Sequence, residues 1–142
     1  MIDVIVVPSS FERTAAGSIS GVIFLRGAAG DFPDSHWSDF PAVVLAWWIA
    51  GLRELVAGHS QAFTGRFMDG PLVFVIERRE DGSGRLSWGS GGSERAAGIV
   101  GLADLLSSVV SAGEVVARVC RVHHWTGSDL ECLERELFLS RS

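Results

Sequence analysis

Residues 31–41, with the sequence DFPDSHWSDFP, hold the densest group of chemically capable side chains in this chain of 142 residues. Asp34, His36 and Asp39 could supply oxygen and nitrogen ligands to a metal ion, or act as a general acid and base. The segment is therefore compatible with the function of a small metal-binding protein or of a hydrolase-like enzyme. Such sites usually draw their ligands from well-separated segments, and no second cluster in this sequence is an obvious complement.

The same segment also fits a structural role at the start of a helix. Ser38 or Asp39 could cap that helix, and the nearby acids would interact favourably with its N-terminal dipole. Three aromatic side chains could hold the loop against the core: Phe32, Trp37 and Phe40. We favour this interpretation because capping needs no residue from another segment. It leaves Asp34 and His36 with no structural role, so any further function of the segment should depend on them.

A second group of potential ligands consists of Cys120, His123, His124 and Cys132. If one helix continues through the pair of histidines, Cys120 shares a face with both through i,i+3 and i,i+4 spacing. The spacing C-x2-H-H-x7-C matches no zinc-finger pattern, and adjacent histidines rarely bind one ion together. We therefore expect no metal and no cofactor here, with Cys120 as a small core residue.

All twelve basic residues are arginines, and the chain contains neither lysine nor tyrosine. This composition excludes a Walker-type phosphate loop, lysine Schiff-base chemistry, Ser-Lys hydrolases and a kinase site. The glycine-rich stretch 82–92 leads into a strand, so it lacks the helix N-terminus that a phosphate-binding loop needs. No catalytic residue is recognisable in the sequence.

Trp47 and Trp48 are adjacent in the most apolar run of the chain, and adjacent residues of a helix point about 100° apart. With Val43, Ala46 and Ala50 they make a helix that is apolar almost all round. Such a helix must be buried on more than one side, either within the fold or at an interface. Burial within the fold is the simpler interpretation, and an interface with a second copy or another protein is the alternative.

The elements that position these residues follow from the pattern of apolar residues. Residues 2–7 and 19–27 are β-branched and apolar, which predicts two strands. A helix should follow, with Pro41 in its first turn and its end near Gly58. Residues 61–89 contain two turn signals and predict a three-stranded antiparallel meander.

The last third of the chain predicts two helices. Apolar residues recur every three or four positions from about Gly101 to Cys120, which is typical of a long amphipathic helix. Residues 128–131 match a capping box that opens a final helix after Gly127. Whether Arg95 to Val100 add a strand is left open. We expect one α+β domain over residues 1–142, with a mainly antiparallel sheet of five or six strands, the order β-β-α-β-β-β-α-α, and helices packed on one face.

Composition limits the partners and the location. A hydrophobic fraction of 47% and a charged fraction of 20% are typical of folded globular proteins. The net charge of -5, with no basic cluster beyond Arg78 and Arg79, argues against nucleic acid. The longest uncharged apolar segment has thirteen residues, against about twenty for a membrane-spanning helix. We expect a cytoplasmic protein without a membrane span or secretory signal.

Three sequence motifs carry a resemblance to a known group of proteins. They are WSDFPAVVLAWWIAGL (37–52), F-x-x-x-F-M-D-G-P (63–71) and the F-V-I-E that follows, before a long helix that ends near a cysteine and a tryptophan. This succession resembles small bacterial proteins of uncharacterised families, some of which look like the immunity proteins encoded beside polymorphic toxins. The resemblance implies an acidic cytosolic domain that binds and blocks a partner, and it carries no catalytic residue.

We therefore expect a non-enzymatic protein-binding domain, with an immunity-type protein that blocks a basic toxin as its most specific form. An acidic surface would steer a basic partner into the complex. One alternative is a metal-binding protein or hydrolase-like enzyme that uses Asp34, His36 and Asp39. Another is a structural homodimer joined through the first helix. The candidate interaction or ligand residues are Asp34, His36, Trp37, Asp39, Trp47 and Trp48.

Overall fold

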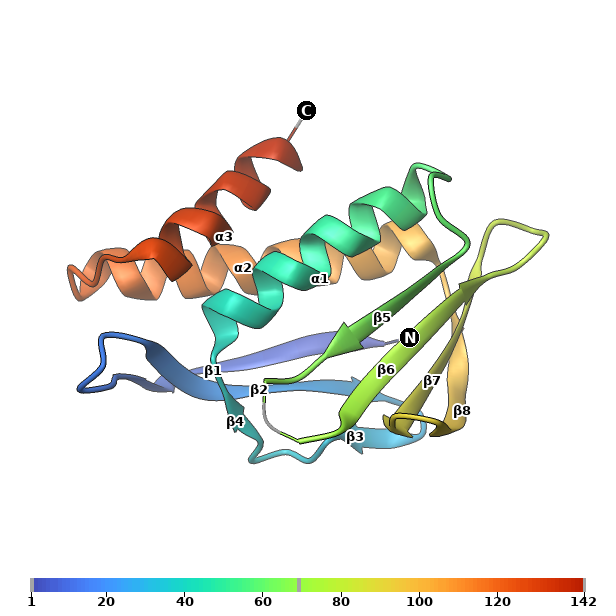
Figure 1. The fold of residues 1–142 in the computed structure, drawn as a ribbon, viewed down its shortest axis with the longest axis horizontal. Coiled ribbons are helices and arrows are strands. Elements are labelled where there is room, and N and C mark those ends of the chain that lie inside the picture. The colour runs from blue at the N-terminus through green and yellow to red at the C-terminus, as the bar shows by residue number, and fades with distance from the viewer. Residues whose placement is uncertain (1, 69, 142) are drawn as a thin grey trace.

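The computed structural model describes residues 2–68 and 70–141, which form eight strands and three helices (Figure 1). In chain order these elements are β1 (Asp3–Arg13), β2 (Ile19–Gly27), β3 (Gly30–Phe32), β4 (Ser38–Asp39), α1 (Pro41–Val56), β5 (Ala62–Arg66), β6 (Leu72–Arg78), β7 (Gly84–Ser90), β8 (Ser93–Val100), α2 (Leu102–Val122) and α3 (Ser128–Leu139). The predicted α+β class and the order of the main elements are confirmed.

The strands of the described residues form two four-stranded sheets with antiparallel pairing throughout. In the first sheet, β2 pairs with β1 on one side and with the short strands β3 and β4 on the other. The second sheet has the order β5-β6-β7-β8, so the predicted meander is extended by one strand. Residues 95–100, which the sequence left open, belong to β8.

The number of sheets and strands differs from the expected single sheet of five or six strands. α1 separates β4 from β5 along the chain, and the strands on either side of it pair only among themselves. β3 and β4 have three and two residues, too few for an alternating pattern to appear in the sequence. Their position is decided by pairing with β2, which is a long-range contact.

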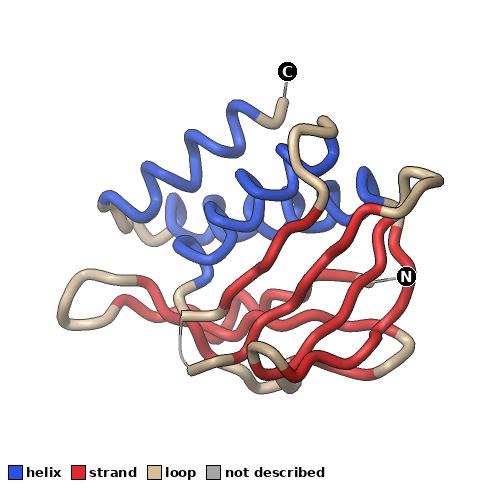
Figure 2. The backbone as a smooth tube through the Cα atoms, turned by 45° about the vertical axis from the view of Figure 1, so that its right-hand side comes forward, coloured by secondary structure: helices blue, strands red, loops and turns tan. Residues whose placement is uncertain are grey.

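The three helices lie together on one side of the two sheets (Figures 1 and 2). α1 is buried on several sides, as its apolar sequence predicts: Trp48, Ile49 and Leu52 have no exposed surface. α2 covers the outer edge of the first sheet, where the Ser108 hydroxyl accepts the backbone N–H of Val4 at 2.9 Å. Covering an edge in this way removes a template for unwanted strand pairing.

Aromatic rings join α1 to both sheets at the centre of the core. The Trp48 ring lies 5.2 Å from Phe67 and 5.0 Å from Phe74, both edge-to-face. Phe32 of the first sheet stacks on Trp88 of the second with ring centroids 5.2 Å apart. Offset-stacked and edge-to-face contacts are the favourable aromatic geometries. The cluster therefore fixes how the two sheets and α1 sit against one another.

The predicted helix caps are wrong, although the helices themselves are confirmed. α1 begins after Phe40 and α3 begins after Gly127, and neither N-cap residue makes a side-chain hydrogen bond. Asp39 lies in β4 and its carboxylate turns elsewhere, while Pro41 at the start of α1 has no N–H that needs a cap. Ser128 is already inside α3, so its hydroxyl is one residue too late to cap the helix.

Among residues 2–68 and 70–141, none of the helices combines the length and the hydrophobicity that a membrane-spanning segment requires.

Candidate functional site

The segment 31–41 begins as a hairpin arm and then makes a tight turn. Asp31 in β3 pairs with Arg26 in β2 at 2.9 Å, and this hydrogen bond lowers the pKa of the Asp31 carboxyl from its ordinary value. One Asp34 carboxylate oxygen accepts the backbone N–H of His36 at 2.7 Å, which is an Asx turn. Both Asp34 and His36 are exposed. Asp34 therefore has a structural role that the sequence did not reveal.

Asp39 is the only buried charged residue in the described part of the chain, with 4% of its surface exposed. Its carboxylate accepts hydrogen bonds from the Trp37 indole Nε1 at 2.9 Å and from the backbone N–H of Phe40 at 2.8 Å. A third donor, the backbone N–H of Met68, lies 3.1 Å from Oδ2. A buried carboxylate is tolerated only when such donors replace water. Asp39 therefore joins its own segment to the β5–β6 loop.

The geometry does not bring the predicted ligands together. Asp39 points inward to Trp37 and Met68, whereas Asp34 and His36 lie on the surface. Within residues 2–68 and 70–141, no group of three His, Cys, Asp or Glu side chains could hold a metal ion. Cys120 has no exposed surface, as expected for a core residue. The arrangement gives no support to the metal-binding or hydrolase-like alternative.

Three loops instead meet at one end of the two sheets. Asp39 holds the β5–β6 loop through Met68, and the backbone N–H of Gly91 in the β7–β8 turn donates to the carbonyl of Pro71 at 2.9 Å. Trp37 contacts the β5 end of the same loop, with its ring 6.0 Å from that of Phe67. We call the exposed side of these loops the loop surface: residues 34–37, 68, 70, 71 and 90–93. Figure 1 shows these connections along the edge of the molecule opposite the helices.

The loop surface presents a mixed set of side chains. Met68 is 44% exposed, Trp37 is half-buried, and Asp34 and His36, which shortly precede Trp37 in the chain, are exposed. Asp34 takes part in no ion pair with another described residue. Methionine and tryptophan are among the residue types enriched at protein interfaces, and both are partly accessible on this surface.

The adjacent tryptophans of α1 have opposite environments. Trp48 is fully buried and its Nε1 donates to the carbonyl of Arg66 at 3.0 Å. Trp47 is 49% exposed. With Val43, Ala46 and Ala50 it forms one wall of a groove of about 260 Å³ between α1 and α3. The sequence predicted both residues as interface candidates, and only Trp47 is accessible.

The other wall of this α1/α3 groove is polar. It consists of Asp129, Cys132, Arg135 and Glu136 from α3. Glu136 is already paired with Arg53 of α1 at 2.8 Å, which ties the two helices together. Among the described residues, Asp129 and Arg135 have no ion-pair partner. The groove thus combines an apolar wall with two unpaired charges of opposite sign.

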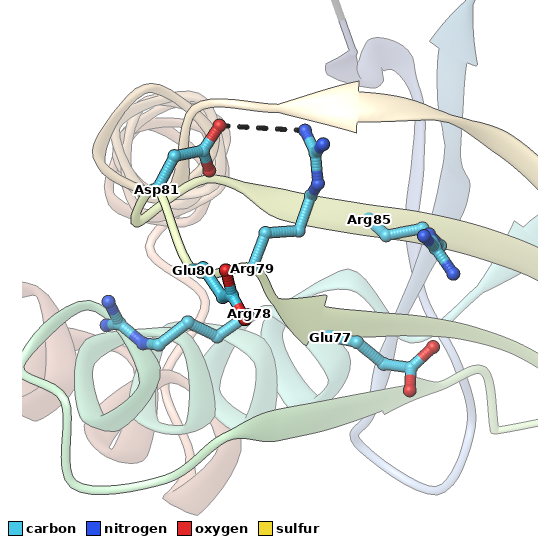
Figure 3. A pocket seen from close by; sticks show the side chains of 6 residues that line it. All are labelled: Glu77, Arg78, Arg79, Glu80, Asp81 and Arg85. Atoms are coloured by element: carbon cyan, nitrogen blue, oxygen red, sulfur yellow. Dashed lines mark ion pairs between the residues drawn. The ribbon is translucent and has the colours of Figure 1, made fainter.

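A second hollow, of about 500 Å³, lies at the β6–β7 turn and is lined only by charged residues. Figure 3 shows that Arg78 extends toward α1, and its guanidinium donates to the carbonyls of Leu55 and Val56 at the end of that helix. Arg79 pairs with Asp81 at 3.7 Å. The three arginines and three acids of the lining balance in charge, and none of them is a histidine or cysteine. Arg78 therefore supports the end of α1, and the Arg79–Asp81 pair supports the turn.

The fold and its surfaces define a small α+β domain with an exposed loop surface, whose loops are joined by hydrogen bonds, and a separate helical groove. Comparison with protein-family models, curated proteins and solved structures finds no match to this chain. Sequence patterns missed Met68 and the α3 wall of the groove. The only signal for Met68 was its position beside the turn sequence Asp69-Gly70, and the Asp69 of that turn lies outside the described residues.

Proposed function

We propose that this chain is a non-enzymatic protein-binding domain of the immunity type, which acts in the cytoplasm and blocks a basic partner protein through its loop surface. The observation that carries this proposal is the buried Asp39 carboxylate, which holds the Met68 amide and the Trp37 indole in place. Loops that a rigid scaffold positions often carry function. Preorganised loops also lose less conformational entropy when a partner binds.

The side chains of the loop surface support a protein as the partner. Methionine and tryptophan are enriched at protein interfaces, and here Met68 and Trp37 stand at adjacent loops joined by one carboxylate. The unpaired Asp34 and the net charge of -5 favour a basic partner, because complementary charge speeds association. The resemblance to immunity proteins is consistent with this mode of action.

Site-specific photo-crosslinking in cells that make the protein naturally tests the proposal. A photoreactive residue is placed at Ser35 in the loop surface and, as a control, at Glu80 in the turn that connects β6 and β7 at the other end of the second sheet. We expect one basic protein to be linked at position 35 and not at position 80. Co-expression of that protein with the chain should relieve any toxicity it has.

Affinity measurements with the purified partner then identify the residues of this chain that contribute to binding. Met68→Ala keeps the backbone N–H that Asp39 holds, and it should weaken binding about tenfold if Met68 is an anchor. Asp34→Asn keeps the acceptor for the His36 amide but removes the charge, so it should slow association in low salt. Glu80→Arg serves as the control. An acidic partner, labelling only at position 80, or binding that neither loop variant changes would contradict the proposal.

A further inference from the structure

The α1/α3 groove has a feature that the loop surface does not explain. Its two unpaired charges lie on α3, on either side of the exposed Cys132 in the sequence. Asp129 is three residues before Cys132, and Arg135 is three residues after it. On a helix, residues three apart lie on one face. The α3 wall of the groove therefore carries a negative charge, a small side chain and a positive charge in sequence.

This order of charges allows two copies of α3 to pair with each other. In a two-fold symmetric interface, residue i of one copy contacts residue j of the other, and j contacts i in return. If a two-fold axis passes beside α3 at the level of Cys132, perpendicular to the helix, the two copies of α3 run antiparallel, and Asp129 of each lies at the level of Arg135 in the other. Both charges, unpaired within the chain, then gain a partner. The remaining charges near the groove, Arg53 and Glu136, are already paired.

The apolar wall fits the same arrangement. Trp47 is 49% exposed in the groove, and the neighbouring Ala46 and Ala50 are small, which allows a second helix to approach closely. Tryptophan and arginine are the residues that most often dominate the binding energy of an interface. We propose that the α1/α3 groove is the interface of a homodimer, in which α3 of one copy packs antiparallel to α3 of the other, with reciprocal Asp129–Arg135 pairs and Trp47 as the apolar anchor.

Sedimentation analysis over a range of protein concentrations tests this proposal. The wild-type chain should show a reversible monomer–dimer equilibrium, and Trp47→Ala should weaken dimerisation at least about tenfold. Asp129→Arg and Arg135→Asp should each weaken it, because each places like charges opposite one another. The double variant D129R/R135D exchanges the charges and should restore the dimer. If the single variants had weakened dimerisation by unfolding the chain, the double variant would not restore the dimer.

Two further measurements make the test specific. Glu131→Arg changes the charge of α3 by the same amount at an exposed position outside the groove, so it should leave dimerisation unchanged. A short bismaleimide should link two chains through Cys132, and Cys132→Ser should abolish that product. Three results would overturn the proposal: a monomer at concentrations up to about 1 mM, a dimer unaffected by Trp47→Ala and both charge reversals, or a double variant no better than the single ones.

Discussion

The carboxylate of Asp39 accepts a hydrogen bond from the backbone N–H of Met68, which is 29 residues further along the chain. This contact crosses from the first sheet to the loop that connects β5 and β6 of the second sheet, and α1 lies between the two residues in sequence. The same carboxylate accepts the indole N–H of Trp37. One buried acid thus sets the relative position of two loops of the proposed binding surface.

Replacement of Asp39 should therefore destabilise the fold. Asp39→Ala leaves three donors without their acceptor, and we expect the free energy of unfolding to fall by about 3 kcal/mol. Asp39→Asn retains one acceptor oxygen, so its free energy of unfolding should fall by less. Urea unfolding measures both changes, and hydrogen exchange of the Met68 amide should become faster in Asp39→Ala. A loss below about 1 kcal/mol for the alanine variant would show that the carboxylate is not needed there.

The two adjacent tryptophans should respond differently to truncation. Trp48→Ala removes a fully buried ring and should cost about 4 kcal/mol of unfolding free energy. Trp48→Phe keeps an aromatic ring but loses the hydrogen bond to the Arg66 carbonyl, so its effect should be intermediate. Trp47→Ala should lower the free energy of unfolding by about 1 kcal/mol or less in dilute solution, where the chain is monomeric. Equal losses for the two alanine variants would contradict the opposite environments of these residues.

Gly65 should not tolerate a side chain. It faces Phe74 across the β5–β6 pair, and a Cβ at this position would overlap the buried Phe74 ring. Gly65→Ala should therefore destabilise the protein by about 2 kcal/mol through overpacking. Gly91→Ala is the matched control, because the nearest atom to its added Cβ is the Pro71 carbonyl oxygen at 3.7 Å. Thermal unfolding compares the two, and similar melting temperatures would argue against the clash.

Arg78 should contribute to stability more than its neighbour Arg79. The Arg78 guanidinium donates to the last carbonyls of α1, where both hydrogen bonding and the helix dipole favour a cation. Arg78→Met should lower the free energy of unfolding by about 1–2 kcal/mol. Arg79→Met removes a surface pair with Asp81 and a long, exposed hydrogen bond to the Ser83 hydroxyl, and it should have little effect on the free energy of unfolding. Chemical unfolding measures both variants, and equal free energies of unfolding would show that Arg78 does not cap α1.

The two cysteines should differ in reactivity. Burial raises the pKa of the Cys120 thiol, so less of the reactive thiolate is present at a given pH, and the side chain has no exposed surface. Cys132 is exposed. In dilute native protein, a disulfide reagent should titrate one thiol quickly and the second only after unfolding or at more alkaline pH. Cys132→Ser should remove the fast phase, and two equally fast thiols would contradict the burial of Cys120.

Local patterns predicted the main elements correctly but not their ends or their partners. The stripe of apolar residues from Leu102 to Cys120 is confirmed as the buried face of α2. The caps were wrong because a serine or aspartate before a helix can make other hydrogen bonds, and Asp39 bonds to a loop that is distant in sequence. The short strands β3 and β4 were missed because pairing with β2, rather than their own pattern, makes them strands.

The sequence alone determined the α+β class, the order of the main elements and the absence of lysine chemistry, because these depend on composition and on periodicity along the chain. Only the tertiary structure decided that Trp48 is buried while Trp47 lines a groove, and that Asp39 turns inward while Asp34 stays on the surface. The physical reason is that burial and hydrogen bonding of a side chain depend on which distant segments pack beside it, and periodicity within one element carries no information about them.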